Sequence, residues 1–79
     1  NSKNAEVDFV VPEEGLAVQV SYSMADADTF KRETEGLIKL HAIQPISKMM
    51  VVTMDEESIV EKDGFHIEIV PLWKWLLRF

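Results

Sequence analysis

Alternating apolar and polar residues predict two strands joined by a tight turn near the start of the chain. Residues 6–11 and 16–22 both alternate, and the turn between them has proline early and glycine last, which suits a hairpin loop. Successive side chains of a strand point to opposite faces, so the pattern defines one apolar and one polar face. The apolar face comprises Val7, Phe9, Val11, Leu16, Val18, Val20 and Tyr22.

The same pattern fixes the register of this hairpin. Pairing Val11 with Leu16 keeps the apolar residues together, whereas a slip of one residue would mix the two faces. The polar face then carries two cross-strand pairs, Asp8 with Gln19 and Glu6 with Ser21. Two carboxylates and an amide are therefore expected side by side.

A helix and a buried strand are predicted next. Asp26 is a suitable N-cap for a helix over about 27–42, which has to end before Pro45. Its apolar stripe is expected to contain Phe30, Leu37, Ile38 and His41. The segment 47–54 contains an apolar run typical of a strand covered on both faces, so the order strand, helix, strand predicts a parallel crossover.

The remaining residues predict a second hairpin and a short terminal helix. Asp63-Gly64 separates two β-prone runs, 58–61 and 65–70, and this dipeptide favours a tight hairpin turn. Pro71 suits the first position of a helix in which only Lys74 and Arg78 are polar. Such a helix requires burial on more than one side, so we infer a neighbour, either another part of a longer chain or a second copy.

These elements predict a single α/β domain. Its mixed sheet has about five strands, one main helix and a short C-terminal helix, in the order β-β-α-β-β-β-α. Residues 1–5 have no periodicity, and we expect a ragged N-terminus or the remnant of a cut in a longer chain. Residues 6–79 are expected to form the domain itself.

Composition narrows the classes of function. The chain has 79 residues, which is enough for one small domain, and it has no cysteine, which excludes disulfides and fits a cytoplasmic protein. Eight cationic residues against fourteen acidic ones do not favour nucleic acid as a partner. No apolar run reaches the ~20 residues of a membrane helix, so we expect no membrane partner.

The polar face of the first hairpin is the candidate site. Two carboxylates on neighbouring strands, with a lysine two residues after the second, would hold Mg²⁺ and stabilise the attacking water in phosphodiester hydrolysis. Asp8 supplies one carboxylate, but Gln19 stands at the position of the second and Ser21 at that of the lysine. The plainer interpretation is a solvated face of an ordinary sheet.

The spacing of Glu6-Val7-Asp8-Phe9-Val10-Val11 and Gln19-Val20-Ser21 resembles the core motif of the restriction-endonuclease-like, PD-(D/E)xK superfamily. The chain is more similar still to the C-terminal nuclease-like domain of a large group of prokaryotic AAA-type ATP-binding proteins. That similarity extends through the strand before the acidic loop 55–57 to the closing run Ile69-Val70-Pro71-Leu72-Trp73-Lys74-Trp75-Leu76-Leu77. It covers nearly all of residues 5–77.

The resemblance implies a restriction-endonuclease-like core that is a fragment of a longer chain. An upstream ATPase region would bind ATP and act as partner, and these residues contain no glycine-rich phosphate loop of their own. Asp8 matches the family's metal-binding aspartate and Gln19 its acidic or amide position, whereas Ser21 departs from the lysine. Both departures weaken Mg²⁺ chemistry, and Glu6 would compensate only in part.

Three functions follow as hypotheses. We expect a catalytically degenerate nuclease-like domain with a regulatory or interaction role and a vestigial site of Asp8, Gln19, Glu6 and Ser21. The first alternative is an active nuclease in which Asp8 and Glu6 bind Mg²⁺. The second is a self-association module, with a homodimer interface on the terminal helix formed by Trp73, Trp75, Leu76 and Phe79.

The remaining polar candidates have plainer explanations. We expect His41 at a helix end and His66 on a strand surface, without a role in catalysis. The acidic run Asp55-Glu56-Glu57 is expected to be a solvated loop.

Overall fold

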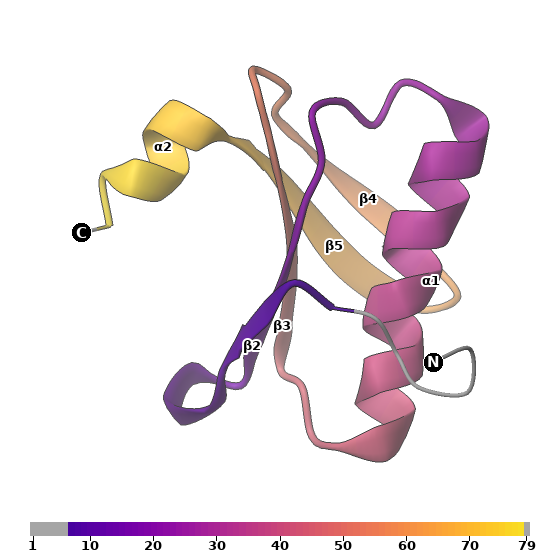
Figure 1. Cartoon of the computed structure of the whole chain (residues 1–79). Coiled ribbons are helices and arrows are strands. Elements are labelled where there is room, and N and C mark those ends of the chain that lie inside the picture. Colours follow the sequence, from indigo (N-terminus) through magenta and orange to yellow (C-terminus); the bar gives the residue numbers. More distant parts are fainter. Residues whose placement is uncertain (1–6, 79) are drawn as a thin grey trace.

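The computed structural model describes residues 7–78, and these form a mixed sheet with a long helix on one face and a short helix on the other (Figure 1). The order of elements confirms the predicted α/β fold. The elements are β1 (Phe9–Val11), a 3-10 turn (Pro12–Glu14), β2 (Leu16–Val20), α1 (Ala27–Ile43), β3 (Lys48–Thr53), β4 (Ser58–Lys62), β5 (Phe65–Pro71) and α2 (Leu72–Leu76).

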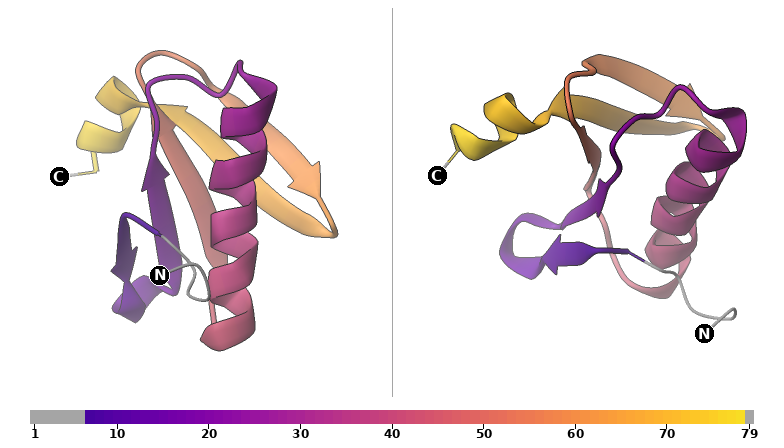
Figure 2. Two further views of the ribbon diagram at one scale, coloured as in Figure 1. Left: turned by 45° about the vertical axis from the view of Figure 1, so that its right-hand side comes forward. Right: turned by 45° about the horizontal axis from the view of Figure 1, so that its top comes forward.

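The five strands lie in the order β1-β2-β3-β5-β4. The three central strands are parallel, and each edge strand is antiparallel to its neighbour (Figure 2). The pairing of Phe9 with Val18 and of Val11 with Leu16 confirms the predicted register. The crossover from β2 through α1 to β3 is parallel, also as predicted.

The core has two layers, one on each face of the sheet. Between α1 and the sheet the buried residues are Ala17, Met24, Leu37, Leu40, Ile46, Met49, Val51, Ile67 and Ile69. On the opposite face they are Leu16, Val18, Met50 and Val52, covered in part by Val11, Val70 and Trp75. Strand β3 contributes to both layers, which confirms that it is a central strand.

Helix α1 begins and ends where its local chemistry requires. The side chain of Asp26 accepts a hydrogen bond from the backbone N–H of Thr29, so the predicted N-cap is confirmed. The helix ends at Ile43, one residue beyond the prediction and shortly before Pro45. Its buried face also contains Thr34, which the apolar pattern missed and whose hydroxyl donates to the backbone oxygen of Phe30.

Three predicted boundaries are wrong by a few residues. Within the described residues β1 begins at Phe9, and β2 ends at Val20 rather than at Tyr22. The chain after β2 stays beside β3, because Ser21 N–H donates to the Val52 oxygen, but it has already turned toward α1. Pro71 closes β5 and is the N-cap of α2 rather than its first residue.

The turn of the first hairpin contacts the loop before β3. Gly15 adopts a left-handed conformation with φ of 61°, which a glycine tolerates without strain. Its oxygen accepts hydrogen bonds from the backbone N–H groups of Ser47 and Lys48 at 2.8 and 3.0 Å. These bonds hold the hairpin against the end of the α1 crossover.

Neither helix in the described part of the chain is long and apolar enough to cross a membrane.

Candidate functional site

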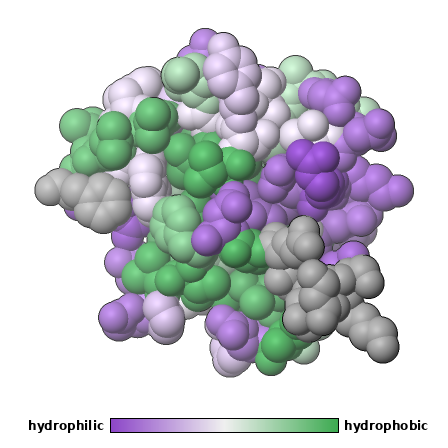
Figure 3. Space-filling model, in the orientation of Figure 1, coloured by the Kyte–Doolittle hydropathy of each residue, from purple (hydrophilic) through white to green (hydrophobic). Residues whose placement is uncertain are grey.

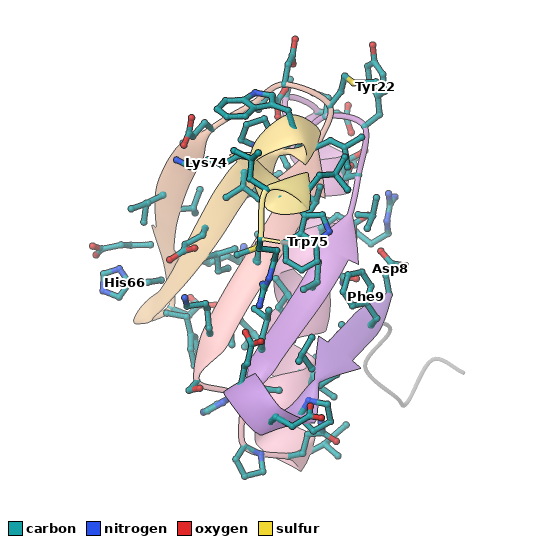
Figure 4. The ribbon with its side chains drawn as sticks, turned by 90° about the vertical axis from the view of Figure 1, so that its left-hand side faces the viewer. Asp8, Phe9, Tyr22, His66, Lys74 and Trp75 are labelled. Carbon is teal, nitrogen blue, oxygen red and sulfur yellow. The ribbon has the colours of Figure 1, made fainter. Side chains whose placement is uncertain are left out.

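Asp8 lies just before β1 and contacts Gln19 of β2, the residue that the predicted register places opposite it (Figure 4 labels Asp8). The backbone N–H of Asp8 donates to Gln19 Oε1 at 3.0 Å. The backbone N–H of Val20 donates to Asp8 Oδ2 at 2.6 Å. The two side chains therefore join β1 to β2 through backbone groups that a strand ladder would otherwise pair.

Gln19 is buried rather than solvated. It is only 3% exposed, because it lies on the face of the sheet that α1 covers. Its Nε2 donates to the backbone oxygen of Glu33 in α1 at 3.3 Å. The interpretation of this face as a solvent-exposed surface is therefore wrong at Gln19, because its amide lies between the β1–β2 hairpin and helix α1. Asp8, by contrast, is exposed.

Ser21, which the resemblance places at a lysine position, makes a short local contact. Ser21 Oγ donates to the backbone oxygen of Ser23 at 2.9 Å, so the hydroxyl stabilises the loop that follows β2. Glu6, the other predicted metal ligand, lies outside the described residues. Within residues 7–78, no group of three or more histidine, cysteine, aspartate or glutamate side chains is placed to hold a metal ion.

A second polar cluster, which the sequence did not predict, lies where β2 and β3 end. Glu56 accepts hydrogen bonds from Ser23 Oγ and from the backbone N–H of Met24, at 2.5 and 2.7 Å. Its own backbone N–H donates to Thr53 Oγ1 at 2.9 Å. The Ser23 hydroxyl, and then the Met24 N–H, hold the pKa of the Glu56 carboxyl below its ordinary value of 4.5.

This cluster modifies the prediction of a solvated acidic loop. Asp55 and Glu57 are exposed, as expected, but Glu56 is half-buried and connects the loop before α1 to the loop before β4. The only signal in the sequence was an acidic residue just after a central strand, near the carboxyl ends of parallel strands. Without the fold, nothing distinguished Glu56 from its two acidic neighbours.

Helix α2 lies on the face opposite α1 and is attached through Trp75. The indole packs against the ring of Phe9, with centroids 5.7 Å apart, and the Arg78 guanidinium stacks over it at 4.7 Å. Arg78 also forms an ion pair with Glu14, and Lys74 forms one with Glu57. Trp75 therefore belongs to the fold of this chain (Figure 4).

The outer side of α2 is an exposed apolar surface. Leu72, Trp73, Leu76 and Leu77 are 39%, 59%, 55% and 75% exposed, respectively. Apolar residues gather on this side of the molecule in the space-filling view (Figure 3). Of the predicted interface residues, Trp73 and Leu76 are thus accessible, Trp75 packs within the chain, and Phe79 lies outside the described residues.

The two histidines occupy separate positions. His41, near the end of α1, places its ring edge against Phe65 at a centroid distance of 5.2 Å. The His66 ring lies on the exposed sheet surface, where its Nδ1 is 3.5 Å from a Glu61 carboxylate oxygen. Figure 4 shows His66 and Asp8 toward opposite edges of the sheet. His66 is therefore not part of the site around Asp8.

In this hairpin site the Gln19 side-chain amide is hydrogen-bonded to backbone groups. One oxygen of the Asp8 carboxylate also accepts a backbone hydrogen bond already. Searches against family models, curated proteins and solved structures found no match to this chain.

Proposed function

We propose that this chain is a nuclease-like domain that has lost cleavage and serves as a regulatory or interaction module. The observation that carries this proposal is the environment of Gln19. Its buried side chain accepts from the Asp8 N–H and donates to the Glu33 oxygen. The side chain at the second ligand position thus stabilises the fold.

The surroundings of Gln19 favour an amide over a carboxylate. A carboxylate has no proton to donate, so its second oxygen would face the Glu33 oxygen at close range. It would also add a buried negative charge near Asp8, at a cost that burial increases. An acid at position 19, which a two-carboxylate metal site requires, is therefore disfavoured by the helix that covers it.

The absence of a lysine at position 21 also supports the loss of cleavage. Phosphodiester cleavage requires a positive group near the charge that develops on the phosphate. At position 21 the side chain is a serine hydroxyl that donates to the neighbouring loop. Asp8 alone would offer Mg²⁺ one carboxylate, one oxygen of which already accepts from Val20.

The interaction role draws on the exposed side of α2. Surfaces that expose several large apolar side chains together commonly bind proteins. Trp73 and Leu76 lie on this surface, whereas Lys74 is paired with Glu57. By the family resemblance, the partner is an ATP-binding region in the same longer chain, which this module would help to regulate.

A cleavage assay tests the loss of catalysis. The protein is incubated with single- and double-stranded DNA and with RNA in millimolar Mg²⁺, beside an Asp8→Asn variant. We expect no cleavage above background and no difference between the two proteins. Mg²⁺-dependent cleavage that disappears in Asp8→Asn would show instead that the alternative, an active nuclease, is correct.

Self-association through α2 is the second candidate, favoured by the same exposed leucine and tryptophan side chains. Leu76→Glu tests it without disturbing Trp75, because Leu76 is 55% exposed. If α2 forms a homodimer, sedimentation equilibrium will show a dimer of the natural chain and a monomer of Leu76→Glu. If α2 binds a different protein, the mass will not change between them.

A further inference from the structure

Strand β4 is an open edge of the sheet. It pairs with β5 on one side, and no other described segment lies beyond it (Figure 2). It spans five residues, none of them proline, and Ile59, its second residue, is 69% exposed. Natural edge strands are usually blunted by proline, bulges or a covering element. The other edge, β1, has only three residues in strand geometry.

The hairpin turn determines which backbone groups of β4 point outward. Asp63 and Gly64 both have positive φ, 54° and 84°, as a two-residue type I′ turn requires. Such a turn is closed by hydrogen bonds between the residues that flank it, Lys62 and Phe65. Bonded and non-bonded pairs then alternate along the strands. The N–H and C=O groups of Ile59 and Glu61 therefore face away from β5.

We propose that β4 pairs antiparallel with β4 of a second copy, so that one sheet runs through both molecules. The outward groups of Ile59 in each copy bond those of Glu61 in the other. This pairing is independent of whether the Asp8 site cleaves anything. It uses a strand edge far along the sheet from the β1–β2 hairpin.

Charge selects one register among those that preserve both faces of the sheet. Centring the two-fold axis on Ile59 would place Glu57 opposite Glu61 of the second copy. Centring it on Glu61 would place that glutamate opposite its own counterpart. Like charges directly opposite each other destabilise a strand pair, so both registers are disfavoured.

Centring the axis on Val60 leaves no like charges opposite each other between Ser58 and Lys62. The acidic residues Glu57 and Asp63 then face each other only beyond the ends of the paired strands. Val60 then meets its own counterpart, Ile59 meets Glu61, and Lys62 meets Ser58. Charged residues often protect an edge strand from pairing, but here the lysine faces a hydroxyl. The net charge of −6 on each copy opposes association, so added salt is expected to strengthen the dimer by screening.

Sedimentation equilibrium of the chain over a range of concentrations tests the proposal. We expect a concentration-dependent dimer that strengthens with salt. Ile59→Pro is expected to give a monomer, because proline lacks the outward N–H yet is tolerated at a strand edge. The matched Ile59→Thr variant keeps that N–H and is expected to dimerise. Circular dichroism checks that both variants fold.

Two charge variants at Ser58 test the register itself. Ser58→Glu would face Lys62 of the second copy and is expected to tighten the dimer by about threefold to tenfold, and Ser58→Lys is expected to weaken it by a similar factor. The two disfavoured registers predict no such opposite effects. These exposed substitutions decide the question even if Ile59→Pro fails to fold.

The proposal is overturned if the natural chain remains a monomer at all concentrations and salt levels. It is also overturned if neither Ser58 variant changes the dimer dissociation constant but Leu76→Glu dissociates the dimer, since the interface would then lie on α2.

Discussion

At the scale of single residues, the structure gives Asp8 and Gln19 a backbone role. A buried donor or acceptor without a partner costs more than a typical hydrogen bond gains, so residues that satisfy backbone groups contribute strongly to stability. Gln19 does this for Asp8, just before β1, and for Glu33 on α1. It therefore joins three parts of the fold at the position that the resemblance assigns to a metal ligand.

Replacing Gln19 with alanine is expected to destabilise the fold. The substitution leaves the Asp8 N–H and the Glu33 oxygen without this partner, at a cost of roughly 1–3 kcal/mol in unfolding free energy. Gln44, the other glutamine, is exposed, and Gln44→Ala is expected to cost less than about 0.5 kcal/mol. Urea denaturation of the two variants measures both. Equal, small effects would contradict a structural role for Gln19.

Glu56 is expected to make stability depend on acidity. Its folded pKa lies below the ordinary value of 4.5, so its carboxylate contributes stability above that value. That contribution is lost as the pH falls through the lower folded pKa. Glu56→Gln should therefore be less stable than the natural chain at neutral pH, with the difference shrinking in acid. Denaturation at a series of pH values measures this, and a difference that grows in acid would be the wrong sign.

At the scale of elements, the local signals in the sequence were sufficient for most of the fold. The Asp26 cap, the Asp63-Gly64 turn and the apolar register of β1 with β2 each depend on neighbours close in the sequence. The burial of Gln19 depends instead on which face α1 covers, and alternation in two strands cannot specify that. The bonds of Glu56 likewise join loops far apart in the sequence.

Gly15 is expected to be more sensitive than Gly64. Alanine at either position is expected to lower the unfolding free energy by about 1–2 kcal/mol, because it must adopt a left-handed conformation. A Cβ at Gly15 would also lie 2.4 Å from Ser47 Oγ, whereas a Cβ at Gly64 meets nothing within 4 Å. Displacing Ser47 Oγ also loses its bond to the Glu14 oxygen, so Gly15→Ala should cost about 1 kcal/mol more. Thermal unfolding of both variants measures the difference, and equal losses would show that Ser47 moves without cost.

At the scale of the whole molecule, the two faces of the sheet are covered unequally. The long helix α1 seals one face, whereas α2, five residues long, covers only part of the other. The sequence predicted that the terminal helix lacks sufficient cover, and its exposed leucine and tryptophan side chains agree with that. It did not distinguish the tryptophan that packs inward from the one that remains outside, because only Lys74 and Arg78 are polar and the apolar pattern does not indicate which side of α2 faces the sheet.

The two tryptophans are expected to differ in their effect on stability. Trp75 packs on Phe9 and the second core layer, so Trp75→Ala should cost roughly 2–3 kcal/mol, less than the ~3–5 kcal/mol of a fully buried tryptophan. Trp73 is 59% exposed, and Trp73→Ala should cost less than about 0.5 kcal/mol. Urea denaturation compares them. The reverse order would mean that α2 packs in a different orientation.

The central claim is that the hairpin site stabilises the fold and does not bind a catalytic metal. Its most direct test is a Mg²⁺ titration followed by the amide NMR signals of Asp8, Gln19 and Val20. We expect no saturable shift of these three signals up to millimolar ion. Saturable shifts at submillimolar Mg²⁺ that disappear in Asp8→Asn would contradict the claim and identify a working metal site.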